Sequence, residues 1–212
     1  MDIVHPMAQA YAEAFTSRSA PLLEELLQFT VEQHPKAHMI SGHWQGRLLQ
    51  FISCMAKPRR ILEIGTFSGY SALCLAEGLA QDGILHTIES RPQDAEMAQA
   101  FFNRSTLSAK IKLHVGDAHL LISELKESWD LVFLDADKVG YTAYLQAIWP
   151  NLKSNALVIA DNVLFHGELL QPELKGKNPK ALQQFNEMVR NLPDAEHVLL
   201  PVRDGLMLIR KK

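Results

Sequence analysis

The sequence predicts an α/β fold, a doubly wound and mostly parallel sheet with an antiparallel C-terminal hairpin, preceded by N-terminal helices. From Arg59 onward, short apolar runs alternate with helical patterns. Such repeated β-α-β units favour a doubly wound sheet. The apolar runs also lack strict alternation with polar residues, which is typical of parallel strands covered by helices on both faces.

Length and composition are consistent with one domain. The chain has 212 residues, of which 47% are hydrophobic and 21% are charged, and this balance excludes a disordered or fibrous protein. We expect a single domain over 1–212, with a helical cap segment at 1–58 and the α/β core at 59–212. The formal net charge of 21 − 24 = −3 argues against a nucleic-acid partner.

The cysteine content and the N-terminus suggest a location. Two cysteines, Cys54 and Cys74, do not make a disulfide framework in a chain of this length. Both fall on predicted helices, where we expect them to be packing residues. The first residues lack a signal-peptide pattern, and no apolar run approaches the roughly 20 residues of a membrane helix. A cytoplasmic protein without a membrane partner is therefore expected.

Three helices are predicted in the N-terminal segment. An alanine-rich pattern favours a helix at 8–15. Ser19 is expected to cap the second helix, with Pro21 in its first turn and Pro35 ending that segment. Apolar residues at helical spacing favour a third helix at 45–55.

The α/β core is predicted as alternating elements. The parallel strands are expected at 60–64, 84–88, 111–115, 131–134 and 157–160. The helices of the core are expected at 71–79, 92–102, 141–149 and 181–191. The last two strands, at 197–202 and 206–210, are joined by a link too short to cross over, so they must form an antiparallel hairpin.

The end of the first strand carries the first candidate binding motif. In a doubly wound sheet, ligands bind at the carboxyl ends of the strands. Glu63 lies at such an end and is followed by Gly65 and Gly69. This Gly-x-x-x-Gly spacing differs from the dinucleotide-binding pattern. A carboxylate there repels a pyrophosphate but accepts hydrogen bonds from an ammonium group, although a plain β-to-α turn is the alternative.

The second and third strands also end in acidic residues. Glu89 lies 24 residues after Gly65, a spacing that suits a carboxylate on the two hydroxyls of a ribose. A solvated strand-end glutamate is the alternative. Asp117 follows the third strand, where it accepts either from an adenine amine or from the backbone of the next helix as its cap.

The fourth and fifth strands predict a metal site. Asp135 follows one strand, and Asp161 with Asn162 follows the other. Carboxylate and amide oxygens are hard ligands, suited to Mg²⁺, Mn²⁺ or Ca²⁺. Lys138 lies three residues beyond Asp135, and a neighbouring dication would lower its pKa so that it accepts a proton. A surface ion pair of this lysine is the alternative.

These stretches together resemble a known family, the cation-dependent class I O-methyltransferases that use S-adenosylmethionine, which include catechol and caffeoyl-CoA O-methyltransferases. The match runs from about Lys36 to the end of the chain, and a segment from Met39 to Gly46 and the Asp-Gly-Leu at 204–206 also fit. The main stretches are Leu-Glu-Ile-Gly-Thr-Phe-Ser-Gly-Tyr-Ser-Ala at 62–72, Leu-Asp-Ala-Asp-Lys at 134–138 and Ala-Asp-Asn at 160–162.

The resemblance implies a Rossmann-like methyltransferase fold and assigns roles to residues of this sequence. Lys138 would be the catalytic base, acting with Asp135. A divalent cation, Mg²⁺ first and Mn²⁺ or Ca²⁺ next, would be held by Asp135, Asp161 and Asn162. The residues implied to bind S-adenosylmethionine are Met39, Ser41, Glu63, Gly65, Thr66, Ser71, Glu89, Asp117, Ala118, Asp137 and Tyr144.

The implied activity is methyl transfer from S-adenosylmethionine to a hydroxyl of a small, metal-chelating acceptor, specifically a vicinal dihydroxy aromatic. A homodimer is also implied. One departure concerns the acceptor: the second acid of the catechol enzyme would fall near Val198, where this sequence has no carboxylate. The alternatives are a methyltransferase acting on protein or nucleic acid, a non-catalytic S-adenosylmethionine-binding protein, and a nicotinamide-dependent dehydrogenase.

Overall fold

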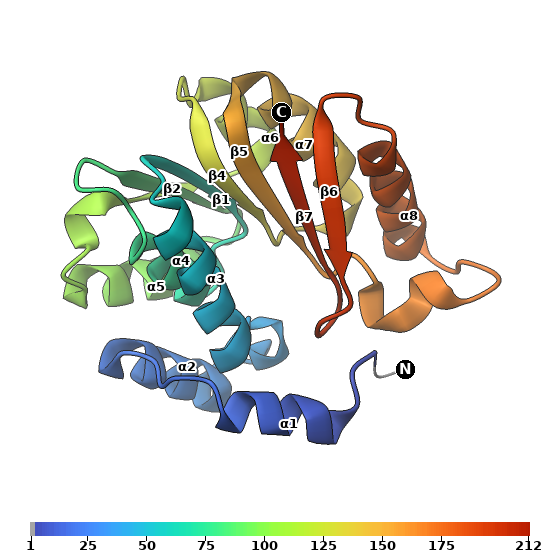
Figure 1. The fold of residues 1–212 in the computed structure, drawn as a ribbon. Coiled ribbons are helices and arrows are strands. Elements are labelled where there is room, and N and C mark those ends of the chain that lie inside the picture. The colour runs from blue at the N-terminus through green and yellow to red at the C-terminus, as the bar shows by residue number, and fades with distance from the viewer. Residues whose placement is uncertain (1–2) are drawn as a thin grey trace.

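A computed structural model describes residues 3–212 of the chain. Within this range the strands form one seven-stranded sheet in the order β3-β2-β1-β4-β5-β7-β6 (Figure 1). The strands are β1 (Arg60–Ile64), β2 (Ile84–Glu89), β3 (Ile111–Val115), β4 (Trp129–Leu134), β5 (Leu152–Asp161), β6 (Ala195–Leu200) and β7 (Leu206–Lys211).

The sheet is parallel except at its C-terminal side. Strands β1 to β5 pair in parallel, whereas β7 is antiparallel to both β5 and β6. The strand β7 therefore lies between β5 and β6, and it forms the predicted hairpin with β6. This arrangement confirms the doubly wound, mostly parallel sheet with an antiparallel C-terminal pair.

The helices connect the strands and precede the sheet. The α-helices are α1 (Pro6–Ala14), α2 (Pro21–Gln33), α3 (Gly42–Ala56), α4 (Tyr70–Ala76), α5 (Pro92–Arg104), α6 (Ala118–Glu124), α7 (Tyr141–Ile148) and α8 (Lys177–Arg190). The short 3₁₀ helices are η1 (Ala37–Met39), η2 (Ser108–Lys110), η3 (Lys138–Gly140), η4 (Trp149–Asn151) and η5 (Phe165–Leu170). None of the helices within 3–212 combines the length and the apolar character needed to cross a bilayer.

Hydrophobic clusters lie on both faces of the sheet. On one face, Leu145 of α7 and Phe185 of α8 pack with strand residues such as Val132. On the other face, α4 and α5 pack with α2 and α3, and Leu26 of α2 is fully buried there. Figure 1 shows α1 and α2 crossing the end of the sheet opposite to the C-terminus. The helices α2 and α3 therefore share a core with the sheet, whereas α1 has no buried residue.

Two local expectations are wrong. Ser19 does not cap α2: the N-cap is Ala20, without a side-chain hydrogen bond, because the Ser19 hydroxyl instead lies 3.0 Å from Nδ1 of His43. Cys54 is exposed on α3 and is not a packing residue, whereas Cys74 is buried as expected. Helical spacing alone did not distinguish the buried face of α3 from its outer face.

Candidate active site

A cavity of about 1010 Å³ opens at the carboxyl ends of the parallel strands. It is lined by the ends of β1 to β5, by the segment 38–41 and by the link between β6 and β7. The predicted site residues that line it are Met39, Ser41, Gly65, Glu89, Asp117, Ala118, Asp135, Asp137, Lys138, Tyr144, Asp161 and Asn162. The others, Glu63, Thr66 and Ser71, are buried and do not line the cavity.

Glu63 is fully buried at the end of β1. Its Oε2 accepts a hydrogen bond of 2.5 Å from the hydroxyl of Thr87, while its Oε1 is buried without a hydrogen bond from the described residues. Burial raises the pKa of the Glu63 carboxyl to about 8, against the opposing effects of Ser71 and Thr87. A buried acceptor without a donor is costly, and a cationic ligand group would relieve that cost.

Gly65 brings the ends of β1 and β4 into close contact. Its φ is +101°, and a Cβ at this position would lie 2.1 Å from the backbone oxygen of Asp135. Only glycine combines this backbone conformation with so close an approach. Any other residue at this turn would therefore push the ends of β1 and β4 apart.

Glu89 is held in place and is not simply solvated. Its Oε2 accepts from the backbone N–H of Phe67 at 2.7 Å, and its Oε1 accepts from the backbone N–H and the Nε of Arg91 at 3.0 and 3.2 Å. The Arg91 guanidinium also lies 3.8 Å from the sulfur of Met39. Arg91 thus links the end of β2 to the segment that precedes α3.

Two aspartates on the cavity wall cap helices. Asp117 accepts from the backbone N–H of His119 at 2.8 Å and caps α6, as the capping interpretation predicts. A contact of Asp117 with adenine stays a prediction. Asp137 accepts from the backbone N–H of Gly140 at 2.8 Å and from the hydroxyl of Tyr144 at 2.6 Å. The ring of Tyr144 stacks on His119, with centroids 4.4 Å apart, so these side chains form one wall.

The predicted cation ligands lie together at the ends of β4 and β5. Asp161 accepts from Nε2 of Gln45 at 2.6 Å and from the backbone N–H of Asn162 at 2.7 Å. Burial and the nearby carboxylate of Asp135 raise the pKa of Asp161 to about 6. Oxygen donors that repel one another in this way fit a divalent cation.

This donor set consists of two carboxylates and an amide. Among residues 3–212, no group of three or more His, Cys, Asp or Glu side chains is placed to hold a metal. Asn162 adopts a φ of 58°, a left-handed conformation that asparagine tolerates better than most residues. An amide oxygen from this residue is therefore needed to complete the proposed set.

Lys138 lies in the same group of side chains. Its Nζ is 2.9 Å from Oδ1 of Asp135 and 2.7 Å from the hydroxyl of Tyr141, and only 11% of its side chain is exposed. Burial disfavours the ammonium, but Tyr141, Asp135 and Asp161 outweigh burial and raise the pKa of Lys138 above its ordinary value. The ion pair with Asp135 therefore exists, but it is largely buried and does not lie on the surface.

Sequence reasoning gave no role to three further residues of this region. Gln45 and Asp204 belong to the family-like stretches, and Arg203 belongs to the hairpin link. Gln45 contacts Asp161, and Asp204 lies 3.3 Å from Nδ2 of Asn162. The available signal was positional: a link that returns to the carboxyl edge of the sheet carries polar side chains toward the site.

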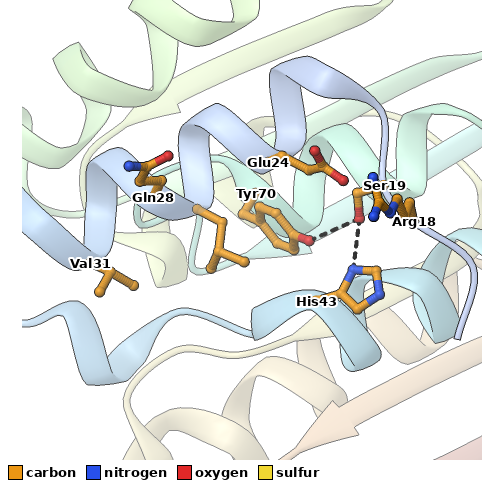
Figure 2. Close-up of a pocket in the computed structure, with 8 residues that line it drawn as sticks. Arg18, Ser19, Glu24, Gln28, Val31, His43 and Tyr70 are labelled. Carbon is orange, nitrogen blue, oxygen red and sulfur yellow. Dashed lines mark hydrogen bonds between the residues drawn. The ribbon is translucent and has the colours of Figure 1, made fainter. Parts of the chain in front are cut away.

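A smaller cavity of about 380 Å³ lies beside α2 and α3. Figure 2 shows Ser19 between His43 and Tyr70, with its hydroxyl 3.0 Å from Nδ1 of His43 and 3.4 Å from the Tyr70 hydroxyl. Val31 on its wall is 58% exposed. This cavity holds none of the predicted site residues.

The fold and the strand-end cavity define a Rossmann-like methyltransferase. The chain belongs to the O-methyltransferase family, because the sequence model of that family matches residues 13–212. This membership confirms the family resemblance.

Individual relatives agree with that membership. The chain is 32% identical over 149 residues to the catechol O-methyltransferase of Niastella koreensis, covering 68% of this chain and 67% of the relative. It is 28% identical to the caffeoyl-CoA O-methyltransferase of Stellaria longipes, covering 92% and 85%.

Solved structures show the same fold. The S-adenosylhomocysteine-bound methyltransferase PaMTH1 of Podospora anserina superposes with a TM-score of 0.90 at 31% identity, covering 97% of this chain and 94% of the other. The O-methyltransferase of Bacillus cereus, also in complex with S-adenosylhomocysteine, has a TM-score of 0.89 at 27% identity and covers 97% of both chains.

Proposed function

We propose that this protein transfers a methyl group from S-adenosylmethionine to a hydroxyl of a small acceptor that chelates a divalent cation, specifically a vicinal dihydroxy aromatic. The observation that carries the proposal is the grouping of Asp135, Asp161, Asn162 and Lys138 at one cavity. The catechol and caffeoyl-CoA activities in the names of the relatives support it.

The proposed cofactor site extends from β1 to β3. The unpaired Oε1 of Glu63 suits the ammonium of the methionine end, and Glu89 suits the ribose hydroxyls. The further proposed contacts are Met39, Ser41, Gly65, Thr66, Ser71, Asp117, Ala118, Asp137 and Tyr144. Structural neighbours solved with S-adenosylhomocysteine support a cofactor of this class.

Asp135, Asp161 and Asn162 are the proposed ligands of the cation, with Mg²⁺ preferred and Mn²⁺ or Ca²⁺ as alternatives. When bound, a divalent cation lowers the pKa of a coordinated hydroxyl and disfavours a neighbouring ammonium. The carboxylates of Asp135 and Asp161 also repel each other, as the raised pKa of Asp161 indicates.

Lys138 is the proposed general base. Its Nζ lies beside Asp135 at this end of the cavity and its pKa is raised there, so it can accept a proton from an acceptor hydroxyl only when a bound divalent cation disfavours the ammonium. Asp135 and Tyr141 keep the amine in place through their hydrogen bonds. Holding the acceptor oxygen near the methyl donor supplies much of the rate enhancement through proximity. We further propose that the protein forms a homodimer and is located in the cytoplasm.

A methyl-transfer screen tests this function. The purified protein is supplied with S-adenosylmethionine carrying a labelled methyl group and with catechols, and matched monohydroxy phenols serve as controls. We expect transfer to the catechols alone, loss of transfer in EDTA, and recovery on addition of Mg²⁺ or Mn²⁺. Full activity in EDTA with no bound metal, or equal transfer to the phenols, contradicts the proposal. Transfer only to protein or nucleic acid would favour the alternative acceptors.

A further inference from the structure

The link between β6 and β7 places two residues of opposite charge at the proposed cation site. Arg203 and Asp204 both line the main cavity, although each lies more than 40 residues from Asp161 in the sequence. Each contacts a side-chain amide, Arg203 that of Gln45 and Asp204 that of Asn162. A side-chain amide has an acceptor oxygen and a donor NH₂ group. A charged neighbour binds one of these two groups and thereby leaves the other group directed away from it, toward the proposed cation site.

Arg203 determines the orientation of Gln45. The guanidinium has only donors, and its Nη1 lies 2.6 Å from Oε1 of Gln45. The amide nitrogen of Gln45 is therefore directed to Oδ2 of Asp161, also at 2.6 Å. The reversed amide would place its oxygen against a carboxylate and its NH₂ against a guanidinium. Because Gln45 is buried, water does not compensate for that reversal.

Asp204 determines the orientation of Asn162 in the opposite sense. An ionised carboxylate has only acceptors, so the group 3.3 Å from its Oδ2 must be the NH₂ of Asn162. No hydrogen bond from the described residues reaches Oδ1 of Asn162, which is left available to a ligand. The carboxylate of Asp204 is itself fixed, because its other oxygen accepts from the backbone N–H of His166.

We propose that Arg203 and Asp204 are positioning residues that select the orientation of the two amides around the cation ligands. With Asp204 present, Asn162 offers an oxygen to the cavity; without it, the amide turns freely and offers a repulsive NH₂ part of the time. Arg203 acts through Gln45, which holds the carboxylate of Asp161. This inference rests on the proposed function for the identity of the ligand, a divalent cation.

Cation affinity tests the proposal directly. Mn²⁺ binding is measured by calorimetry on the full chain, with melting temperature as a check on folding. We expect Asp204→Asn and Arg203→Met each to weaken Mn²⁺ binding by about 10–100-fold, the usual range for a residue that orients a ligand. The matched control is Glu196→Gln, because Glu196 pairs with Arg210 at 2.6 Å on exposed β6 and should leave Mn²⁺ binding unchanged. Wild-type affinity in both test variants overturns the proposal.

A swapped pair distinguishes orientation from general damage. A carboxylate at position 162 presents an oxygen whichever way it turns, so Asn162→Asp combined with Asp204→Asn should recover Mn²⁺ binding that Asp204→Asn alone loses. Failure of the swapped pair to recover binding, in a protein that melts like the wild type, counts against orientation as the cause.

Amide hydrogen exchange tests the orientation without any cation. The side-chain NH₂ protons of Asn162 and Gln45 should exchange slowly in the wild type, and those of Asn162 should lose protection in Asp204→Ala. Slow exchange without Mn²⁺ binding would mean that the proposed cation centre is wrong while the orientation holds. Rapid exchange of both amides in the wild type overturns the inference itself.

Discussion

The Nζ of Lys138 lies 2.7 Å from the hydroxyl oxygen of Tyr141. That hydroxyl in turn lies 2.9 Å from the backbone oxygen of Leu134 and 3.0 Å from that of Asp161. Burial raises the pKa of Tyr141, so the hydroxyl stays neutral, and its single hydrogen is shared between these two carbonyls while its oxygen accepts from the lysine. Tyr141 therefore ties Lys138 to the ends of both strands that carry the proposed cation ligands.

The first prediction concerns Lys138. Replacement by methionine keeps the length of the side chain but removes the amine, so kcat on a catechol should fall by roughly 10²–10⁴-fold, the usual effect of losing acid–base catalysis. The affinity for S-adenosylmethionine should change little, and steady-state kinetics with calorimetry measures both quantities. Lys175→Met, in the exposed segment before α8, is the control. A kcat within a few-fold of wild type would remove the base role from Lys138.

The second prediction concerns Glu63 and the cofactor. Glu63→Ala removes the buried carboxylate whose Oε1 lacks a donor. Calorimetry should show S-adenosylmethionine binding weakened by about 1–3 kcal/mol, the range for a hydrogen bond to a charged group. Glu77→Ala, at the exposed end of α4, should bind as the wild type does. Equal affinity in both variants would place the methionine end of the cofactor elsewhere.

The third prediction is a pH dependence of stability without cofactor. Because the pKa of Glu63 is raised to about 8, the folded protein keeps a proton that the unfolded chain releases above about pH 4.5. The free energy of unfolding should therefore fall as pH rises from about 4.5 to 8. Glu63→Gln should remove this contribution, and melting curves between about pH 6.5 and 8 avoid the contribution of Asp161, whose pKa is about 6. If the melting temperatures of the wild type and of Glu63→Gln change in parallel over this pH range, the prediction is wrong.

The fourth prediction concerns the close approach at Gly65. Gly65→Ala forces a Cβ against the backbone of Asp135, so the ends of β1 and β4 must separate. We expect a lower melting temperature together with weaker cofactor binding. Gly176→Ala is the matched control, because Gly176 also has a positive φ, of +89°, but its nearest neighbour atom would be 3.8 Å away. If Gly65→Ala and Gly176→Ala lower the melting temperature and weaken cofactor binding equally, the positive φ alone explains the effect and the close approach to Asp135 does not.

Local signals in the sequence located most of the sheet. The strand β3 occupies the predicted residues 111–115, where apolar and polar residues alternate and Gly116 ends the run. The strand β5 begins at Leu152, five residues before the predicted start, because its first half is polar and partly exposed. Asn155 has a φ of 63° there, and the pairing of β4 with β5 shifts register nearby, so this half lacks a strand pattern.

The pattern of strand ends placed only the site residues that follow strands, whereas Met39, Ser41 and Tyr144 were predicted from the family resemblance. Asp135 and Asp161 could be placed together because parallel strands end at one edge of a sheet. Gln45 and Arg203 could not, because 158 residues separate these hydrogen-bonded partners and no local pattern joins them. Ser19 shows the same limit: its place before Pro21 predicted a cap, but its hydroxyl contacts two side chains that are distant in the sequence, His43 and Tyr70.

The place of β7 between β5 and β6 affects how the chain assembles during translation. Among the described strands β7 is synthesised last, yet it pairs with both neighbours. Until it leaves the ribosome, the nascent chain exposes one edge of β5, with the apolar residues 156–160 along it. An open apolar edge recruits strands from other chains. We therefore expect premature termination before residue 206 to produce a species that is prone to aggregation.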